Sequence, residues 1–345
     1  MIDRDKDSSF TKRLLFLWHE KNHWSCQWRL HLRTRHSKKS GQVVFEALKH
    51  CEYNCYQIDI NLSSWTVIDH RGIKYPLNQE SFSFEKEGQS IGFDCVVNMI
   101  HGAPGENGEL AAYLEERNIA HTSCDAEIAA LTYDKRACLE VANGHGFPSA
   151  KRLSVNKGDE PSAETVREQV VFPCFVKANR AGSSFGVYKV MNAQELPAAL
   201  QDAFKEDQEI LIEAALEGRE ITVGVLEWKG KVHVLPITEI ISENDFFDYE
   251  AKYEGKSQEI TPANLPEAWE AAAKKMAKEL YTTLGLKGIT RTEFIFKDGI
   301  PHLLEVNTIP GMTLQSIIPQ QAEAAGISLS ELITGVIDQS LMKKA

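Results

Sequence analysis

Acidic, amide and guanidinium side chains alternate with apolar ones in TRTEFIFKDGIPHLLEVN, residues 290–307. Alternation along a strand places Arg291 and Glu293 on one face, and in the next strand-like run Glu305 and Asn307 share a face. Carboxylate and amide oxygens suit Mg²⁺ that bridges nucleotide phosphates, and a nearby arginine can stabilise a developing oxyanion. The segment therefore indicates a magnesium–nucleotide site, and the alternative is an exposed, ion-paired hairpin.

The turn Lys297-Asp298-Gly299 decides whether the two polar faces meet. A two-residue Asp-Gly turn would pair Glu293 with Leu304 and separate the faces. A three-residue turn with Gly299 in the left-handed region would pair Arg291 with Glu305 and gather all four polar side chains. We therefore predict the three-residue turn.

A second candidate element is VFPCFVKANRAGSSFGVYKV, residues 171–190. Lys177 ends an apolar strand, and the Gly/Ser loop from Gly182 to Gly186 could cradle phosphate with its backbone amides. The segment lacks the G-x-x-x-x-G-K-[ST] pattern of a P-loop, so taken alone it could be a tight hairpin. Lys135, in a helical pattern, would ordinarily be a solvated charge.

A third element is VNMIHGAPGENGEL, residues 97–110. An apolar strand ends at His101, and a glycine-rich loop follows that contains Glu106. In a doubly wound sheet, ligands bind at the carboxyl ends of the strands. The loop is thus a candidate substrate site, and a plain glycine loop with a surface histidine is the alternative.

The segment HEKNHWSCQWRLHLRTRH, residues 19–36, contains a literal H-E-x-x-H at His19, Glu20 and His23. A zinc protease would need the two histidines one turn apart on a helix and a third ligand downstream. The motif is short enough to arise by chance, so we disfavour a zinc site.

Composition bounds the class of protein. The 345 residues are 43% hydrophobic, no apolar run is long enough to span a bilayer, and the first residues do not resemble a secretory signal. Seven scattered cysteines without a C-x-x-C pair argue for reduced thiols, and we expect a cytoplasmic protein. Residues 1–40 carry 10 Lys+Arg against 4 Asp+Glu, whereas the rest carries 28 against 45, which disfavours nucleic acid as a partner.

The order of the elements predicts the architecture. Strands alternate with helices up to about residue 120, which indicates a doubly wound parallel sheet. Helices are expected over about 125–142, over 163–169 and from Pro266 to about Leu284. A final helix should begin where Ser328 and Glu331 have the spacing of a capping box.

Taken in order, several motifs closely resemble the D-alanine:D-alanine ligases of the ATP-grasp superfamily. They are H-G-A-P-G-E-N-G, D-K, F-V-K-A-N-R-A-G-S-S-F-G, D-Y-E-A-K-Y, R-T-E and L-L-E-V-N-T-I-P-G-M-T. The resemblance extends from about residue 40 to the C-terminus. It implies an α/β (α+β ATP-grasp) fold with an N-terminal doubly wound parallel sheet domain over 1–125, a central ATP-lid domain over 126–212 and a C-terminal domain over 213–345.

The resemblance also implies an activity and roles for individual residues. ATP would convert the first D-alanine to an acyl phosphate, and the amine of a second D-alanine would then attack it to give the dipeptide used in peptidoglycan synthesis. ATP would contact Lys135, Lys177, Gly182, Ser184, Glu213 near the adenine, Glu220 near the ribose, and Lys252. Two Mg²⁺ ions, for which Mn²⁺ can substitute, would be held by Glu293, Glu305 and Asn307. The reacting groups would be contacted by Arg291, Gly311, Ser183 and Tyr253, and the substrates by His101, Glu106, Ser316 and Ile317.

Three further expectations follow from the family. Members are usually homodimers that bind only small molecules, with no membrane insertion. Tyr253 favours a dipeptide over a D-alanyl-D-lactate ester, because ester-forming relatives tend to carry histidine in that loop. The alternatives are another carboxylate–amine or D-Ala–D-lactate ligase, and a catalytically impaired remnant.

The region before residue 40 departs from the family pattern. The expected Gly-Gly is absent, and Arg35 stands where a glutamate should orient the ammonium of the first D-alanine. A locally altered reading frame across residues 18–39, in the gene or in the recorded sequence, explains the abrupt change to Trp, His and Arg better than a zinc site does. A genuinely divergent loop is the remaining interpretation.

Overall fold

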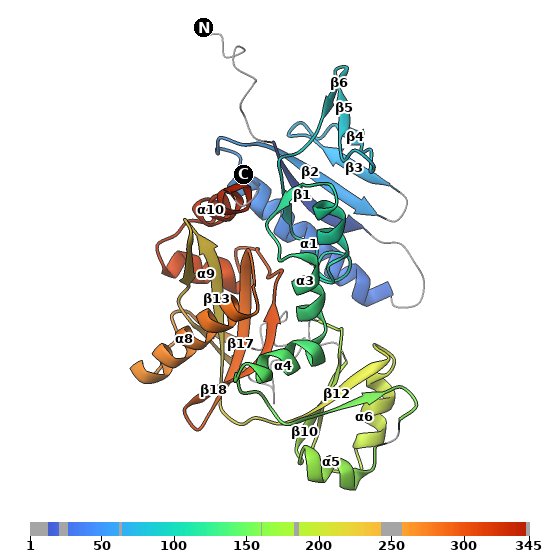
Figure 1. Ribbon diagram of the computed structural model, residues 1–345, viewed down its shortest axis with the longest axis vertical. Helices are drawn as coiled ribbons and strands as arrows, with labels where there is room; N and C mark the ends of the chain where they lie inside the picture. Colours follow the sequence, from blue (N-terminus) through green and yellow to red (C-terminus); the bar gives the residue numbers. More distant parts are fainter. Residues whose placement is uncertain are drawn as a thin grey trace.

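The computed structural model describes the backbone of residues 13–20, 27–61, 64–159, 161–182, 186–242 and 257–342. These residues form three large sheets and one two-stranded sheet, with the N-terminal sheet and the central sheet at opposite ends of the molecule (Figure 1). The C-terminal sheet, which contains β13, β17 and β18, lies between them in this view.

The N-terminal sheet has the strand order β4-β3-β2-β1-β7-β8. Its strands are β1 (Arg13–Glu20), β2 (Asn54–Asn61), β3 (Trp65–Ile68), β4 (Lys74–Pro76), β7 (Cys95–Asn98) and β8 (Ala120–His121). The predicted parallel pairing is confirmed for β2, β1, β7 and β8. By contrast, β3 and β4 are antiparallel, because their short connections leave no room for a crossover. The other elements of this region are α1 (Gln27–Ala47), α2 (Glu109–Glu115) and the hairpin of β5 (Phe84–Lys86) and β6 (Gln89–Ile91).

The central sheet is antiparallel, with the order β11-β10-β12-β9. Its elements are β9 (Arg152–Asn156), α5 (Ala163–Gln169), β10 (Cys174–Ala178), β11 (Val187–Val190), α6 (Leu196–Ala203) and β12 (Glu209–Ala214). The helix predicted over 163–169 is confirmed, and Ser162 caps it by accepting a hydrogen bond from the amide of Thr165 at 3.0 Å.

The C-terminal sheet has the order β16-β15-β13-β17-β18, with β14 paired to β13. Its strands are β13 (Arg219–Trp228), β14 (Lys231–Val234), β15 (Thr238–Ser242), β16 (Ser257–Ile260), β17 (Ile289–Lys297) and β18 (Ile300–Asn307). The helices of this region are α3 (Ala126–Tyr133), α4 (Lys135–Gly144), α8 (Glu267–Thr283), α9 (Ile317–Ala324) and α10 (Leu329–Met342).

Sequence signals at helix ends are confirmed in two places. Helix α8 begins directly after Pro266 and ends before Leu284, as predicted. Ser328 and Glu331 form the capping box before α10, because each side chain accepts a hydrogen bond from the amide of the other residue.

The single helix predicted over about 125–142 is wrong, because the chain breaks into α3 and α4 at Asp134. This residue has an extended backbone, with φ −90° and ψ 100°, and its side chain accepts a hydrogen bond from the amide of Ala137 at 2.9 Å. Asp134 therefore caps a new helix that begins at Lys135.

The predicted three-residue turn between β17 and β18 is also wrong. Lys297 pairs with Ile300, so Asp298 and Gly299 form a two-residue turn, with positive φ values of 53° and 78°. A bulge then makes Leu304 an extra residue, because Phe294 pairs with Leu303 whereas Glu293 pairs with Glu305. Arg291 consequently lies opposite Asn307, so the four polar residues form two cross-strand pairs, separated by the pair of Thr292 and Val306, in a different register from the predicted one.

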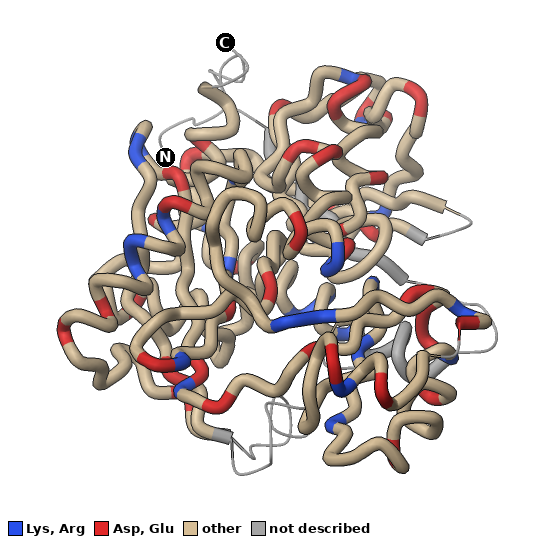
Figure 2. The backbone as a smooth tube through the Cα atoms, turned by 60° about the horizontal axis from the view of Figure 1, so that its bottom comes forward, with Lys and Arg blue, Asp and Glu red and all other residues tan. Residues whose placement is uncertain are grey.

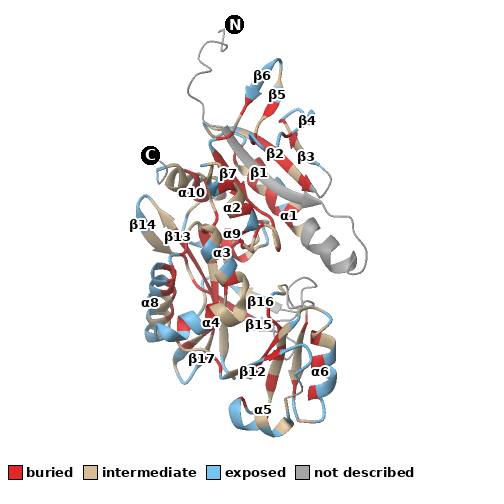
Figure 3. Ribbon diagram, turned by 45° about the vertical axis from the view of Figure 1, so that its right-hand side comes forward, coloured by how far each residue is buried: buried red, intermediate tan, exposed pale blue. Residues whose placement is uncertain are grey.

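The buried residues form separate cores (Figure 3). One core joins α1 and β7 of the N-terminal sheet to α9 and α10, through residues such as Leu48, Val97 and Val336. Another lies between the C-terminal sheet and helices α3, α4 and α8. The central sheet has a core of its own, which contains Val176 and Ile212.

Three general features accompany this architecture. No helix among the described residues is long and apolar enough to cross a membrane. The six cysteines in the described part of the chain are free thiols. Lysine and arginine are interspersed with acidic residues along the chain (Figure 2).

Candidate active site

A cavity of about 430 Å³ opens where the loops of the three sheets converge. Its lining includes ten of the residues predicted from the sequence: His101, Glu106, Lys135, Gly182, Arg291, Glu305, Asn307, Gly311, Ser316 and Ile317. Residues far apart in the chain therefore meet in one place.

The β17–β18 hairpin supplies the acidic side of this cavity. The Arg291 Nη2 atom donates to Oε1 of Glu293 at 2.6 Å, and the side chain of Glu293 is buried. The Oδ1 atom of Asn307 accepts a hydrogen bond from the amide of Ile309 at 3.0 Å. Two carboxylates and an amide fit the oxygen preference of magnesium. Within the described ranges, no group of three or more His, Cys, Asp or Glu side chains is placed so that it could hold a metal ion.

Two lysines lie next to acidic side chains of this region, Lys135 in the cavity lining and Lys177 outside it. Lys135 Nζ donates to the carbonyl oxygen of Ala181 at 2.5 Å and lies 3.7 Å from Oε2 of Glu305. Lys177 Nζ lies 2.7 Å from Oε2 of Glu213. Burial opposes the charge on Lys177, but the carboxylates of Glu213, Glu305 and Glu220 outweigh it and raise the pKa of the lysine. Both lysines are therefore held by defined partners, and lysine is a common ligand of phosphate.

Glu213 and Glu220 lie beside this cavity instead of lining it. Glu213, in β12, is buried next to Lys177. Glu220, in β13, pairs with Ile240 and Ile295 in the C-terminal sheet and contributes to the pKa of Lys177. The two glutamates thus come from the central and C-terminal sheets, and both act electrostatically on Lys177.

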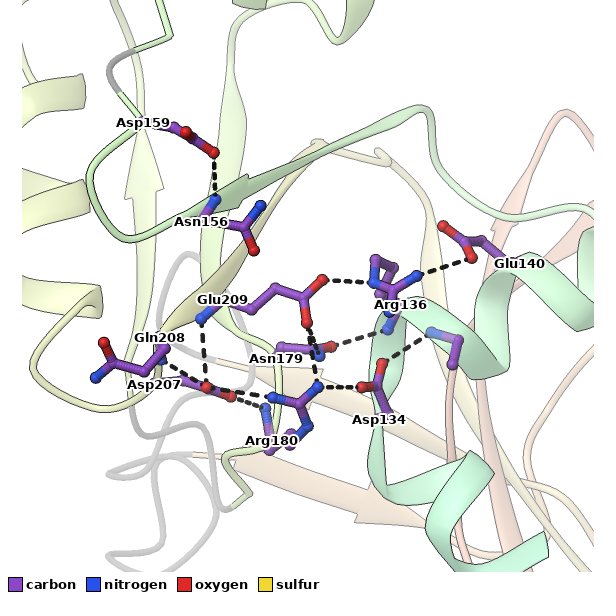
Figure 4. Close-up of polar contacts among 11 residues, drawn as sticks. Asp134, Arg136, Glu140, Asn156, Asp159, Asn179, Arg180, Asp207, Gln208 and Glu209 are labelled. Carbon is purple, nitrogen blue, oxygen red and sulfur yellow. Dashed lines mark hydrogen bonds and ion pairs between the residues drawn. The ribbon is translucent and has the colours of Figure 1, made fainter. Parts of the chain in front are cut away.

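A polar network connects the start of α4 to the central sheet (Figure 4). The Arg180 guanidinium contacts Asp134 at 2.5 Å, Glu209 at 3.2 Å and Asp207 at 3.6 Å. The amide of Arg136 donates to Oδ1 of Asn179 at 2.9 Å. Because Lys135 lies between Asp134 and Arg136, the network fixes this lysine relative to the loop that begins at Ala181.

The cavity lining also contains the residues predicted to bind substrate. His101 Nδ1 lies 3.7 Å from Oε1 of Glu106, and its Nε2 atom lies 3.5 Å from Oγ of Ser40. The Ser316 hydroxyl accepts a hydrogen bond from the amide of Thr313 at 3.1 Å at the start of α9. A Cβ atom added to Gly311 would come within 2.9 Å of Oγ of Ser316, so the backbone approaches the serine closely there.

The atypical N-terminal segment reaches this cavity through α1. His36, Lys39 and Ser40 line it, whereas Arg35 is exposed and is not part of the lining. Burial is the largest cause that lowers the pKa of His36 to about 4, and electrostatic interactions with His101, Lys39 and Arg35 act in the same direction. At neutral pH this side of the cavity therefore carries the neutral imidazole of His36 and the ammonium of Lys39.

The H-E-x-x-H motif does not form the helix of a zinc protease. His19 and Glu20 lie in strand β1, where they pair with Ile60 and Asn61. A strand does not give the motif the helical backbone that the zinc site of such a protease needs, so the disfavoured zinc hypothesis loses its geometric requirement. His23 lies outside the described residues.

Some predicted residues cannot be placed and others were missed. Ser183, Ser184, Lys252 and Tyr253 lie outside the described residues. Sequence reasoning missed Tyr133, Glu259, Thr313 and Gln315, which all line the cavity. Glu259 follows the D-Y-E-A-K-Y motif closely, and this proximity was the signal available for it.

Comparisons with known proteins agree with this geometry. A family model described as "D-ala D-ala ligase C-terminus" matches residues 139–338. The chain is 49% identical over 302 residues to a D-alanine--D-alanine ligase of Flavobacterium johnsoniae, covering 88% of this chain and 94% of the relative. It is 47% identical over 310 residues to the ligase of the same name from Christiangramia forsetii, covering 90% and 95%.

Solved structures give the same result. The VanG D-Ala:D-Ser ligase from Enterococcus faecalis has a TM-score of 0.80 and 27% identity, covering 96% of this chain and 100% of the other. A D-alanine--D-alanine ligase from Bacillus anthracis complexed with ATP has a TM-score of 0.75 and 26% identity, covering 97% and 99%.

Proposed function

This chain belongs to the D-alanine--D-alanine ligase family, and from that membership we propose that it joins two D-alanine molecules with hydrolysis of ATP to ADP and phosphate. The observation that carries the proposal is the meeting of Lys135, Arg291, Glu305, Asn307 and Ser316 in one cavity. This arrangement suits a reaction in which a carboxylate is first phosphorylated and then attacked by an amine.

The first step would use the cationic and acidic sides of the cavity together. Lys135 and Lys177 would bind ATP phosphates as point charges, and Gly182 would bring backbone close to them. A carboxylate oxygen of the first D-alanine attacks the γ-phosphorus and ADP leaves. Glu293, Glu305 and Asn307 would hold magnesium, which when bound neutralises charge on the phosphoryl oxygens.

The second step would take place between the hairpin and α9. The amine of the second D-alanine attacks the acyl carbon and inorganic phosphate leaves. The nitrogen that attacked loses a proton to solvent. Arg291 and the backbone near Gly311 would stabilise the oxyanion that forms. Ser316 and Ile317 would hold the carboxylate of the incoming D-alanine. His101 and Glu106, which line the cavity, would contact the first D-alanine.

The departure before residue 40 bears on how active this chain is. The side of the cavity where the family has a glutamate for the ammonium of the first D-alanine carries His36 and Lys39 in this chain. We therefore propose that the chain as written binds the first D-alanine weakly. This fits the hypothesis of an altered reading frame over residues 18–39.

The decisive experiment measures ADP release as a function of D-alanine, D-serine and D-lactate. We expect release that depends on D-alanine, and a higher rate when residues 18–39 are replaced by a loop that carries the family's Gly-Gly and glutamate. Tight ATP binding without D-alanine-dependent ADP release in both proteins would contradict the proposed function. Resequencing the coding DNA from an independent source tests the frame hypothesis, which an identical in-frame segment would contradict.

A further inference from the structure

Glu259 is a carboxylate of the cavity that none of the roles above uses. It lies in β16, opposite Ile240 of β15, and its side chain is half-buried in the cavity lining. Gln320 of α9 donates from Nε2 to Oε2 of Glu259 at 3.0 Å. The carboxylate is therefore held in one place, instead of moving freely at the sheet edge.

The same amide fixes Glu259 relative to the start of α9. Gln320 Nε2 also donates to the carbonyl oxygen of Gln315 at 2.8 Å, and the next residue is Ser316. One side-chain nitrogen thus bridges the carboxylate and the residue that precedes the helix. Glu259 and Ser316 consequently face the cavity as neighbours on two different elements.

The two neighbours carry opposite electrostatic character. The first turn of α9 presents backbone N–H groups with partial positive charge, and the Ser316 hydroxyl stands at its beginning. Glu259 presents a carboxylate. An α-amino acid, with its carboxylate and ammonium on one carbon, matches this pair of charges, whereas a 2-hydroxy acid matches only the helix start.

The environment of Glu259 also favours a cationic ligand. Burial raises the pKa of Glu259, and the hydrogen bond from Gln320 and the charge of Arg291 only partly offset this effect. An ammonium placed beside the carboxylate would further compensate its lost hydration.

We propose that Glu259 is a specificity-determining residue that binds the α-ammonium of the second substrate while Ser316 and the start of α9 bind its carboxylate. The inference rests on the proposed function and adds a preference for amino acids over hydroxy acids. It concerns binding only, because no bond is made or broken at Glu259.

The test is the variant Glu259→Gln, which keeps the shape of the side chain and an oxygen that can accept from Gln320. ADP release is measured against D-alanine and against ATP, and products formed from equimolar D-alanine and D-lactate are quantified by mass spectrometry. We expect the KM for the second D-alanine to rise about tenfold or more, as for loss of a charge-assisted hydrogen bond. The dipeptide-to-ester product ratio should fall by a similar factor, and the KM for ATP should stay unchanged.

Glu227→Gln is the matched control. Glu227 lies in β13 of the same sheet and accepts a hydrogen bond from Nε2 of Gln339 in α10 at 3.0 Å, but it does not line the cavity. This variant should keep the parental D-alanine dependence and product ratio.

The possible outcomes separate this inference from the proposed function. An active parent chain whose Glu259→Gln variant keeps both the D-alanine dependence and the product ratio would overturn the inference alone. A parent chain without D-alanine-dependent ADP release would overturn the proposed function and, with it, this inference. Equal changes in the KM for ATP and for D-alanine would indicate a structural effect and would also contradict the inference.

Discussion

Glu305 is the residue at which several charges of the cavity meet. It lies opposite Glu293 in the hairpin, faces Lys135 Nζ at 3.7 Å and contributes to the raised pKa of Lys177. We predict that Glu305→Gln lowers kcat about 100-fold or more, because a proposed magnesium ligand is lost and metal stabilisation of the transition state contributes several kcal/mol.

The measurement for Glu305→Gln is ADP release against magnesium concentration. The variant should need more magnesium for half-maximal rate. Glu279→Gln, an exposed residue on α8 that pairs with Lys275, should leave the magnesium curve unchanged. An unchanged magnesium requirement in Glu305→Gln would speak against its role as a ligand.

His36 should make the stability of the protein depend on pH. Its pKa falls from 6.5 to about 4 on folding, chiefly through burial. Between these two pH values the histidine is protonated in the unfolded chain but neutral in the folded protein. The free energy of unfolding should therefore fall as pH decreases from about 6.5 to about 4. The loss should stay well below the full conversion of about 1.4 kcal/mol per pKa unit, because His36 is only partly buried and solvent screens its charge.

Urea unfolding at several pH values measures this effect. His36→Gln should flatten the curve over that pH range, whereas His302→Gln, at an exposed position of the β17–β18 hairpin, should retain the parental slope. Equal slopes for the parent and His36→Gln would show that other groups cause the acid sensitivity.

The connection between α4 and the central sheet is the element on which the position of Lys135 depends. Arg180 joins Asp134 at the start of the helix to Asp207 and Glu209 of the central region (Figure 4). We predict that Arg180→Ala raises the KM for ATP about five- to tenfold with a smaller effect on kcat, because Lys135 and the loop after Ala181 lose their common support. The stability cost should be about 1 kcal/mol or less, as the guanidinium is partly exposed.

Arg180→Lys should restore part of the ATP affinity, since a lysine keeps the charge but lacks the planar fork. Lys205→Ala, which removes an exposed ion pair with Asp202 in the same region, is the control and should leave the KM for ATP unaltered. If Arg180→Ala and Lys205→Ala bind ATP equally well, the network does not position the lysine.

Most elements were predictable because their signals are local. The apolar strands, the proline before α8 and the Ser328–Glu331 box each lie within a few residues of the structure they specify. The extended conformation of Asp134 depends instead on a network with Arg180 and Glu209, which come from distant parts of the chain. A pattern within one segment could not reveal that break.

In the β17–β18 hairpin, the face on which the polar side chains lie was predictable from the sequence, but the pairing register of the two strands was not. The alternation of Arg291 and Glu293 correctly placed both on one face. The bulge at Leu304 arises where β17 must pair with β13 and β18 at once, so it depends on the whole sheet. Glu259 was missed for a similar reason, because only the packing of β16 beside α9 brings it to the cavity.

At the scale of the whole molecule, the cavity lies between separately packed parts. The N-terminal sheet shares a core with α9 and α10, whereas the central sheet has its own core. The residues proposed to bind the nucleotide and its metal belong to both sides, since Lys177, a proposed phosphate ligand, lies in the central sheet and Glu305, a proposed magnesium ligand, lies in the C-terminal sheet. A bound nucleotide would therefore link parts that share few apolar contacts.

This arrangement predicts that ATP and magnesium together stabilise the protein more than either alone. A ligand present at about 100 times its Kd should raise the free energy of unfolding by about 2.7 kcal/mol, provided that it binds only the folded state. The measurement is thermal unfolding with a non-hydrolysable ATP analogue, with and without Mg²⁺, and with EDTA as the control for the metal. Because Lys177 and Glu305 lie in different sheets, the central and C-terminal parts should unfold in one transition at a higher temperature when both ligands are present. Stabilisation by the analogue that persists unchanged in EDTA would show that nucleotide binding does not depend on the carboxylates of the hairpin acting through a metal.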